Sequence, residues 1–238
     1  MNILITGGST GLGAACVRHL ATDKGNHIYF TYARSSEAAN QLTASFENVT
    51  AFHCDFTNTE SVDSFVQSLE NIALDVLLNN ASLTFPKEYF HKSDPIKFLS
   101  SFENNILPVI KITQAAITIF RKKKSGKIIT ILSSALINKP PVGWSEYVAN
   151  KNYILSLSKS WATENIKFNI SSNCLSPSFM ETGFTSDTDS RIVEQMINDH
   201  PLKRLLTVQE VVKALSFLVN ASLHINGINL VMNAGTDI

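Results

Sequence analysis

A tyrosine and a lysine lie four residues apart in the segment YVANK, as Tyr147 and Lys151. At this spacing the two side chains share one face of a helix. A free tyrosine has a pKa of about 10, and a neighbouring ammonium favours the phenolate and lowers that pKa. Ser134 precedes Tyr147 with twelve residues between them, at the end of an expected strand, where its hydroxyl can hydrogen-bond a carbonyl oxygen. These residue types at this spacing predict a site for general acid–base chemistry.

Two alternatives stay open for these residues. Ser133 is a rival serine, although the alternation of a strand points its side chain to the side opposite Ser134. Tyr147 and Lys151 would also fit an ordinary exposed pair on a helix surface.

A glycine-rich segment follows the apolar run 3–5 and precedes an apolar helix start. Gly7, Gly11 and Gly13 give the pattern T-G-x-x-x-G-x-G. Bare backbone in such a turn lets N–H groups approach a pyrophosphate, and the helix N-terminus adds partial positive charge. The alternative is a tight turn in an α/β protein that binds no nucleotide.

The elements that must position these residues are strands and helices in alternation. Strands are expected at 3–6, 27–32, 49–53, 74–79, 127–132, 168–175 and 228–232, and helices at 11–23, 35–46, 59–69, 94–124, 146–165 and 207–219. A long irregular stretch is expected at 176–201. This order predicts a single α/β domain over residues 1–238, a Rossmann-like doubly wound parallel sheet of about seven strands with helices on both faces.

The composition bears on which partners and which cell compartment the sequence predicts. Lysine plus arginine and aspartate plus glutamate both count 20, so net charge gives no hint of nucleic acid or an anionic membrane. No secretory signal is expected, and no apolar run approaches the roughly 18 residues of a membrane span. The three cysteines, Cys16, Cys54 and Cys174, lie far apart. They suit a reducing cytoplasm, and neither they nor the histidines predict a metal site.

Several further motifs stand in a fixed order along the chain. Asn79-Asn80-Ala81 ends the fourth expected strand, Asp55 follows the third, and Pro177-x4-Thr182 follows the sixth. With the glycine pattern and Ser134, Tyr147 and Lys151, they resemble the short-chain dehydrogenase/reductase family over essentially the whole chain. The resemblance is strongest to the 3-oxoacyl-(acyl-carrier-protein) reductase type, which the segments PLKR at 201–204 and NGINLVMNAG at 226–235 also fit.

The resemblance implies a catalytic set of Ser134, Tyr147, Lys151 and Asn105. Tyr147 would protonate the developing alkoxide, and Lys151 would also hold the nicotinamide ribose. Asn105 matches a position where a helix kink frees a carbonyl for a proton-relay water. Pro108 supports a kink, because it lacks the N–H that would reach the carbonyl of residue 104. A solvated asparagine on a helix is the alternative for Asn105.

The end of the second strand decides the cofactor. No acidic residue stands there to bind a ribose 2′-hydroxyl, whereas Arg34 with Ser35 at a helix start suits a 2′-phosphate. NADPH is therefore favoured over NADH, although Thr10 lies where many NADP-using relatives carry a basic residue. The expected cofactor-binding residues are Gly7, Ser9, Thr10, Gly11, Leu12, Gly13, Arg34, Ser35, Asp55, Phe56, Asn80, Ala81, Tyr147, Lys151, Pro177, Met180 and Thr182.

Two departures from the family pattern put local geometry in doubt. Ser82 and Ser178 stand where the family usually has glycine, and a serine is strained wherever φ must be positive. The irregular stretch after Pro177 carries apolar side chains such as Phe179 and Phe184, which would form a lid over an apolar ketone or pack as an ordinary loop.

The substrate is the least determined part. The resemblance implies a small or carrier-bound acyl substrate, with acyl carrier protein as partner and a homotetramer or homodimer as assembly. Basic residues at 121–124 and Lys167 would meet the acidic carrier, or would only solvate a helix end. A reductase acting on a polyketide, a sugar or another small alcohol is the main alternative, and a non-catalytic dinucleotide sensor or scaffold is the minor one.

Overall fold

A computed structural model describes residues 1–137, 140–183, 185 and 188–236. Seven parallel strands form one sheet in the order β3-β2-β1-β4-β5-β6-β7. The strands are β1 (Asn2–Ile5), β2 (His27–Tyr32), β3 (Val49–His53), β4 (Val76–Asn79), β5 (Gly126–Ile131), β6 (Ile170–Pro177) and β7 (Asn229–Met232). This confirms the doubly wound α/β fold.

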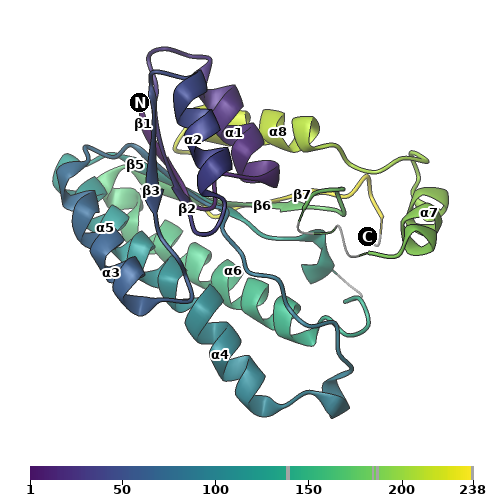
Figure 1. The fold of residues 1–238 in the computed structure, drawn as a ribbon. Coiled ribbons are helices and arrows are strands. Elements are labelled where there is room, and N and C mark those ends of the chain that lie inside the picture. Colours follow the sequence, from purple (N-terminus) through teal and green to yellow (C-terminus); the bar gives the residue numbers. More distant parts are fainter. Residues whose placement is uncertain (138–139, 184, 186–187, 237–238) are drawn as a thin grey trace.

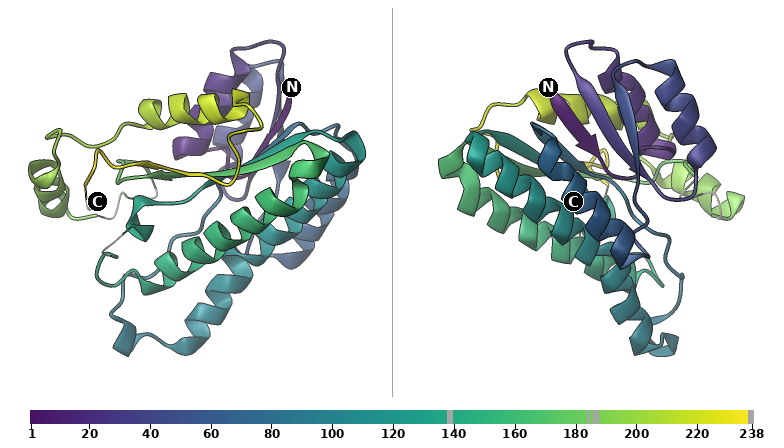
Figure 2. Two further views of the ribbon diagram at one scale, coloured as in Figure 1. Left: turned by 180° about the vertical axis from the view of Figure 1, so that it is seen from behind. Right: turned by 60° about the vertical axis from the view of Figure 1, so that its left-hand side comes forward.

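Helices cover both faces of the sheet (Figures 1 and 2). One face carries α1 (Gly11–Ala21), α2 (Ser36–Ser45) and α8 (Val208–Asn220). The other carries α3 (Thr59–Ser68), α4 (Pro95–Asn105), α5 (Leu107–Lys123) and α6 (Ser145–Asn165). Helix α7 (Ser190–Asp199) stands apart from both layers. The central strands β1 and β4 are mostly apolar, because helices bury both of their sides.

Two of the expected elements differ in detail from the structure. The expected helix 94–124 is divided at Ile106 into α4 and α5, which confirms the kink expected beside Asn105, and Pro108 lies in the first turn of α5, where its missing N–H costs least. The expected irregular stretch 176–201 contains α7, which the Asp189 side chain caps by accepting from Arg191 N at 2.8 Å. Its apolar residues recur with helical period, so the signal was present in the sequence.

Asp94 before Pro95, and Thr207 three residues before Glu210, are helix-start signals in the sequence, and both lie at observed helix starts. Asp94 accepts from Ile96 N at 2.9 Å ahead of Pro95, and Thr207 with Glu210 forms the capping box of α8. Helix α5 ends at Lys123, one residue earlier than expected, because Lys124 takes the left-handed conformation, with φ 55°.

The strand order reverses direction between β1 and β4. Ligands of such sheets bind at the carboxyl ends of the strands near this point. The carboxyl ends of β1, β4, β5 and β6 therefore define where a site can form.

Candidate active site

Tyr147 and Lys151 both extend from the first turns of α6 into one pocket. Lys151 Nζ donates to Ile131 O at the end of β5, at 3.0 Å. The same ammonium lies 5.7 Å from the centroid of the Tyr147 ring. The structure thus brings the two side chains together, and the sheet fixes the lysine end of the pair.

The pKa of Tyr147 departs from the expectation. Burial raises it above the ordinary value, while the side-chain hydrogen bond with Ser133 acts in the opposite direction. Burial also lowers the pKa of Lys151, to about 8. The expected depression of the tyrosine pKa by Lys151 was wrong for this structure, because desolvation outweighs the pull of a lysine that donates to a backbone carbonyl.

The two serines of the sequence pattern both lie beyond the end of β5. Ser133 interacts with Tyr147 and also accepts from Ala135 N at 3.2 Å. Ser134 begins the one-turn helix 134–136. The chain leaves the strand before it reaches either serine, so strand alternation no longer decides their directions. Catalysis by Ser134 stays a prediction.

Asn105 occupies the last position of α4, beside the helix break. Its side-chain oxygen accepts from Leu83 N at 2.8 Å, and its side-chain nitrogen donates to Ser101 O at 3.3 Å. Asn150 of α6 donates to the Ser101 hydroxyl at 2.8 Å. These bonds join α4, α6 and the loop after β4 around the pocket, and they add Ser101 and Asn150 to the residues named from sequence.

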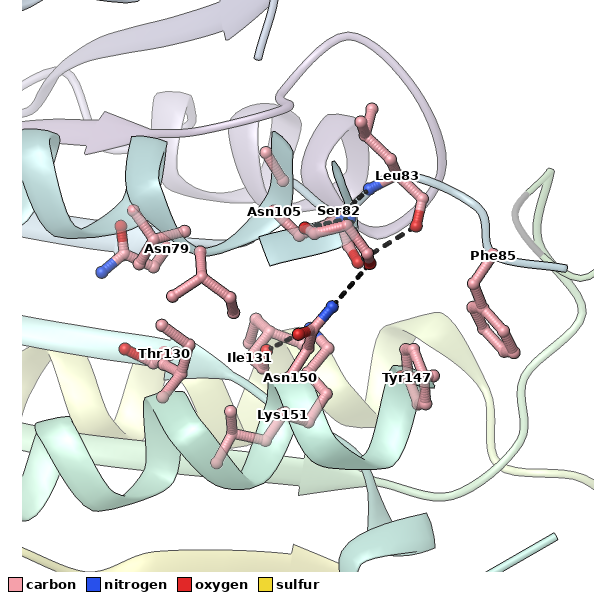
Figure 3. A pocket seen from close by; sticks show the side chains of 16 residues that line it. Asn79, Ser82, Leu83, Phe85, Asn105, Thr130, Ile131, Tyr147, Asn150 and Lys151 are labelled. Carbon is pink, nitrogen blue, oxygen red and sulfur yellow. Dashed lines mark hydrogen bonds between the residues drawn. The ribbon is translucent and has the colours of Figure 1, made fainter. Parts of the chain in front are cut away.

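The pocket lies between the ends of β4 and β5 and helices α4, α5 and α6 (Figure 3). Asn79 Oδ1 and Thr130 Oγ1 are buried without a protein hydrogen-bond partner. The lining residues are Asn79, Ala81, Ser82, Leu83, Phe85, Ser101, Asn105, Ile106, Val109, Thr130, Ile131, Leu132, Tyr147, Asn150, Lys151 and Ile154. Most of the pocket surface is apolar, so a polar reactant would find only a few hydrogen-bonding groups there, and these are buried.

The turn between β1 and α1 has the properties of a dinucleotide cradle. Gly7 and Gly11 have φ of +66° and +52°. A Cβ on Gly13 would lie 2.1 Å from Gly7 O, so only glycine lets helix and turn approach this closely. Thr10 precedes α1 without a side-chain cap, which leaves N–H groups of the first turn for a ligand. The turn fits the pyrophosphate of NAD(P)H, which Ser9 and Leu12 would also border.

The loop after β4 closes one side of this turn. Asn80 Nδ2 donates to Thr6 O at 2.9 Å and to Gly7 O at 3.0 Å. The Thr6 hydroxyl accepts from the backbone N–H of Asn80 and of Ala81, each at 3.0 Å. Sequence reasoning missed Thr6, although it opens the T-G pattern.

Arg34 and Asp55 lie near one another beyond β2 and β3. Hydrogen bonds from Thr57 lower the pKa of Asp55, and the charge of Arg34 lowers it further. Arg34 is exposed, and Ser35 precedes α2 without a side-chain cap. The guanidinium and the start of α2 are thus open to an anion, and Phe56 is buried beneath this edge.

The loop after β6 reaches the glycine turn from the other side. A Cβ on Gly11 would lie 3.7 Å from Thr182 Cβ, whereas Met180 packs against the core. Pro177 ends β6, and Ser178 N donates to Met232 O at 2.9 Å. Neither Ser178 nor Ser82 has a positive φ, so the condition under which these serines would be strained is not met. Phe184 lies outside the described residues.

The basic residues lie at the opposite end of the strands from the pocket. Lys123 and Lys124 precede β5, and Lys167 precedes β6. Lys123 forms an ion pair with Asp75, and Lys167 Nζ lies 5.4 Å from the centroid of the Phe168 ring. The six residues of β5 span roughly 20 Å between this cluster and the pocket.

Known proteins share both the sequence pattern and this fold. Residues 1–192 match the family model described as short chain dehydrogenase. Nodulation protein G of Rhizobium sp. (strain N33) is 28% identical over 236 residues, 98% of this chain and 95% of that protein. The 3-oxoacyl-(acyl-carrier-protein) reductase MabA of Mycobacterium bovis is 28% identical over 222 residues, 92% of this chain and 85% of that protein.

Among solved structures, ElxO with NADP bound is similar, with a TM-score of 0.86, 26% identity and coverage of 98% of this chain and 97% of that chain. No helix within the described part of the chain is long and apolar enough to cross a membrane.

Proposed function

The chain belongs to the short chain dehydrogenase family and is an NAD(P)-dependent oxidoreductase that acts on CH–OH groups, and from this premise we propose that it reduces a ketone to a secondary alcohol with NADPH. A 3-oxoacyl chain on acyl carrier protein is the proposed substrate. The observation that carries the proposal is Tyr147 with Lys151 in a buried pocket at the carboxyl edge of the sheet, next to the glycine turn.

Each residue has a task in this reaction. Bound NADPH supplies the hydride. Tyr147 Oη gives its proton to the carbonyl oxygen, and its raised pKa keeps that proton on the phenol at neutral pH. The Lys151 ammonium stabilises the phenolate that remains. A hydroxyl after β5 stabilises the developing charge, a role we assign to Ser134, while Ser133 orients the phenol.

The preference for NADPH rests on the end of β2. Arg34 is exposed beside the uncapped start of α2, and a 2′-phosphate there gains both the guanidinium and the helix N-terminus. The carboxylate of Asp55 accepts from Thr57 N at 2.9 Å, so it is held in its own turn. The NADP bound in the similar ElxO structure agrees with this preference.

The carrier protein is the finer part of the proposal. Relatives named as 3-oxoacyl-(acyl-carrier-protein) reductases support it. Lys122, Lys124 and Lys167 are exposed and could meet an acidic carrier, whereas Lys123 is already paired with Asp75. A second candidate, a free ketone without a carrier, is favoured by the position of this cluster at the amino ends of the strands, away from the pocket.

Paired substrates separate these candidates. Lys124→Glu with Lys167→Glu should lower kcat/KM for a carrier-bound 3-oxoacyl chain, because rim charges act mainly on the encounter rate. The same variant should leave the reduction of a short free ketone unchanged. Equal rates on the carrier-bound substrate before and after the change would remove the support for carrier docking at this cluster. Lys123 stays unchanged, since glutamate there would face Asp75.

We also propose a homodimer or homotetramer in the cytoplasm. Helix α4 exposes Ile96 and Leu99 by 64% and 56%, and α8 exposes Phe217 by 53%. Apolar side chains of this size on helix surfaces suit contacts between subunits. Light scattering on the purified protein gives the assembly, and a monomer at micromolar concentration would contradict it.

A further inference from the structure

Within the described residues, the rings of Phe85 and Trp144 pack against Tyr147, the proposed proton donor. Phe85 stacks on Tyr147, with ring centroids 4.6 Å apart and planes at 24°. Trp144 meets both rings edge-on, at 5.1 Å from Phe85 and 5.4 Å from Tyr147. Figure 3 shows the Phe85 and Tyr147 side chains next to one another at one end of the pocket. Phe85 comes from the loop after β4, so two separate segments hold one tyrosine ring.

The loop is fastened on both sides of Phe85. Before it, Leu83 N donates to Asn105 Oδ1 at 2.8 Å. After it, Glu88 N donates to Gly143 O at 3.1 Å, and the Glu88 carboxylate accepts from Lys97 Nζ at 3.1 Å. Phe85 is therefore held over α6 by contacts with α4 and with the segment that precedes α6.

The position of Gly143 supports this arrangement. Its φ is +81°, and a Cβ there would lie 3.3 Å from Glu88 N. A side chain would strain the backbone and press on the loop that carries Phe85. On the helix side, Trp144 is the residue before α6 and its carbonyl accepts from Val148 N at 2.9 Å, so the helix itself fixes the second ring.

We propose that Phe85 is a positioning residue for the proton donor: with Trp144 it fixes the plane of the Tyr147 ring and keeps bulk water from the phenol. The inference rests on the proposed role of Tyr147 as proton donor. A proton donor that is already held in one plane pays a smaller entropic cost to reach the reactive orientation. A misplacement of about 1 Å can cost a large part of the rate. The family pattern of serine, tyrosine and lysine does not include these two rings.

In the described part of the chain, few charged groups surround the Tyr147 phenol, so access of water can change its ionisation. On α6, Lys151 Nζ lies 5.7 Å from the centroid of the Tyr147 ring and Glu146 is the residue before Tyr147, whereas Cys174 on β6 acts on Lys151. The segment after β5 contributes the uncharged Ser133. The loop after β4 and helices α4 and α5 line the pocket with uncharged residues. Admission of water at Phe85 should therefore act on the phenol directly and favour its ionised form.

The test compares Phe85→Ala, Phe85→Leu and Phe90→Ala. Phe90 is a matched control, because it is 72% exposed and its ring contacts Phe98 rather than Tyr147. The pKa of Tyr147 is measured by NMR on protein with 13C-labelled tyrosine, with Tyr147→Phe identifying the resonance. Steady-state kinetics with NADPH and a short free ketone give kcat and KM, and thermal unfolding checks that each variant is folded.

We expect Phe85→Ala to lower the pKa of Tyr147 and to reduce kcat about threefold to tenfold, the range set by the loss of one aromatic pair. KM should change by less than about twofold on the same reasoning. Phe85→Leu should restore part of kcat, and Phe90→Ala should match the unmodified enzyme.

An unchanged pKa of Tyr147 in folded Phe85→Ala would overturn the proposal. A higher KM with unchanged kcat would overturn it too, since Phe85 would then contact substrate instead of positioning the donor. Normal turnover by Tyr147→Phe would refute the proton-donor role itself. The two failures are distinguishable, because the NMR titration needs no substrate.

Discussion

Gly13→Ala tests whether the glycine turn is built for close approach. Gly13 lies in the first turn of α1, where alanine would by helix propensity alone stabilise the protein by about 1 kcal/mol. A Cβ at this position would lie 2.1 Å from Gly7 O and 2.7 Å from Asn80 Nδ2. The two effects have opposite signs, so their sizes decide the outcome.

The steric effect is the larger one. Gly7 O has to move by about 1 Å to reach an ordinary contact distance, and overpacking of this kind costs about 1–3 kcal/mol. The move also strains the two bonds that Asn80 Nδ2 donates, to Thr6 O and to Gly7 O, each worth about 1 kcal/mol. The net loss of unfolding free energy is therefore about 2–4 kcal/mol, and Tm should fall by about 5–15 °C.

Cofactor binding should fall together with stability. Displacement of the Gly7 peptide by about 1 Å misplaces the turn for a pyrophosphate, and we expect Kd for NADPH to rise at least about tenfold. Fluorescence titration with NADPH and thermal unfolding measure the two effects. Gly25→Ala is the control, because a Cβ there meets only the Asp23 side chain, at 3.2 Å. If Gly13→Ala raised Tm and kept its affinity for NADPH, the close approach would not be required.

Four further outcomes follow from the site. Tyr147→Phe should bind NADPH normally in fluorescence titration but lose ketone reduction by about 10²-fold or more in the NADPH absorbance assay; near-normal turnover would contradict the assignment. Arg34→Ala should raise KM for NADPH and leave KM for NADH unchanged, and an equal effect on both would make Arg34 structural. Because the pKa of Lys151 is about 8, its ammonium is lost as pH rises through that value, so kcat/KM for reduction should fall above about pH 8; a flat profile to pH 10 would refute this. Asn105→Ala removes the acceptor of Leu83 N and should cost about 1 kcal/mol of stability with a lower kcat, whereas unchanged kcat and Tm would show that this contact is dispensable.

Much of the fold could be predicted because its signals are local. Strands such as β2 and β3 are short apolar or β-branched runs, and their bounds agree with the expectation. The capping residues Asp94 and Thr207 marked helix starts correctly. The position of the glycine turn at the edge near Asn80 also followed, because parallel strands place their carboxyl ends together.

The electrostatics of the site could not be predicted in the same way. Helical spacing correctly placed Tyr147 and Lys151 side by side, but the sign of the tyrosine pKa depends on burial by residues distant in sequence. Phe85 reaches Tyr147 only through the fastening of its loop to Asn105 and Gly143. The sequence positions of Phe85 and Tyr147 do not predict that contact. The contact between Trp144 and Tyr147 is a local one, because the two residues are three apart in the sequence.

The placement of the catalytic pair also bears on how the phenol is activated. Lys151 Nζ donates a hydrogen bond to the Ile131 carbonyl of β5. It lies 5.7 Å from the centroid of the Tyr147 ring. A charge at that distance in a partly buried site acts more weakly than one in direct contact, which agrees with a tyrosine pKa raised by burial. A protonated phenol is the form that reduction requires, whereas oxidation of an alcohol requires the phenolate. With Tyr147 as the proposed proton donor, the raised pKa keeps its phenol in the form that reduction uses at neutral pH, and we expect oxidation of the alcohol to gain as pH rises.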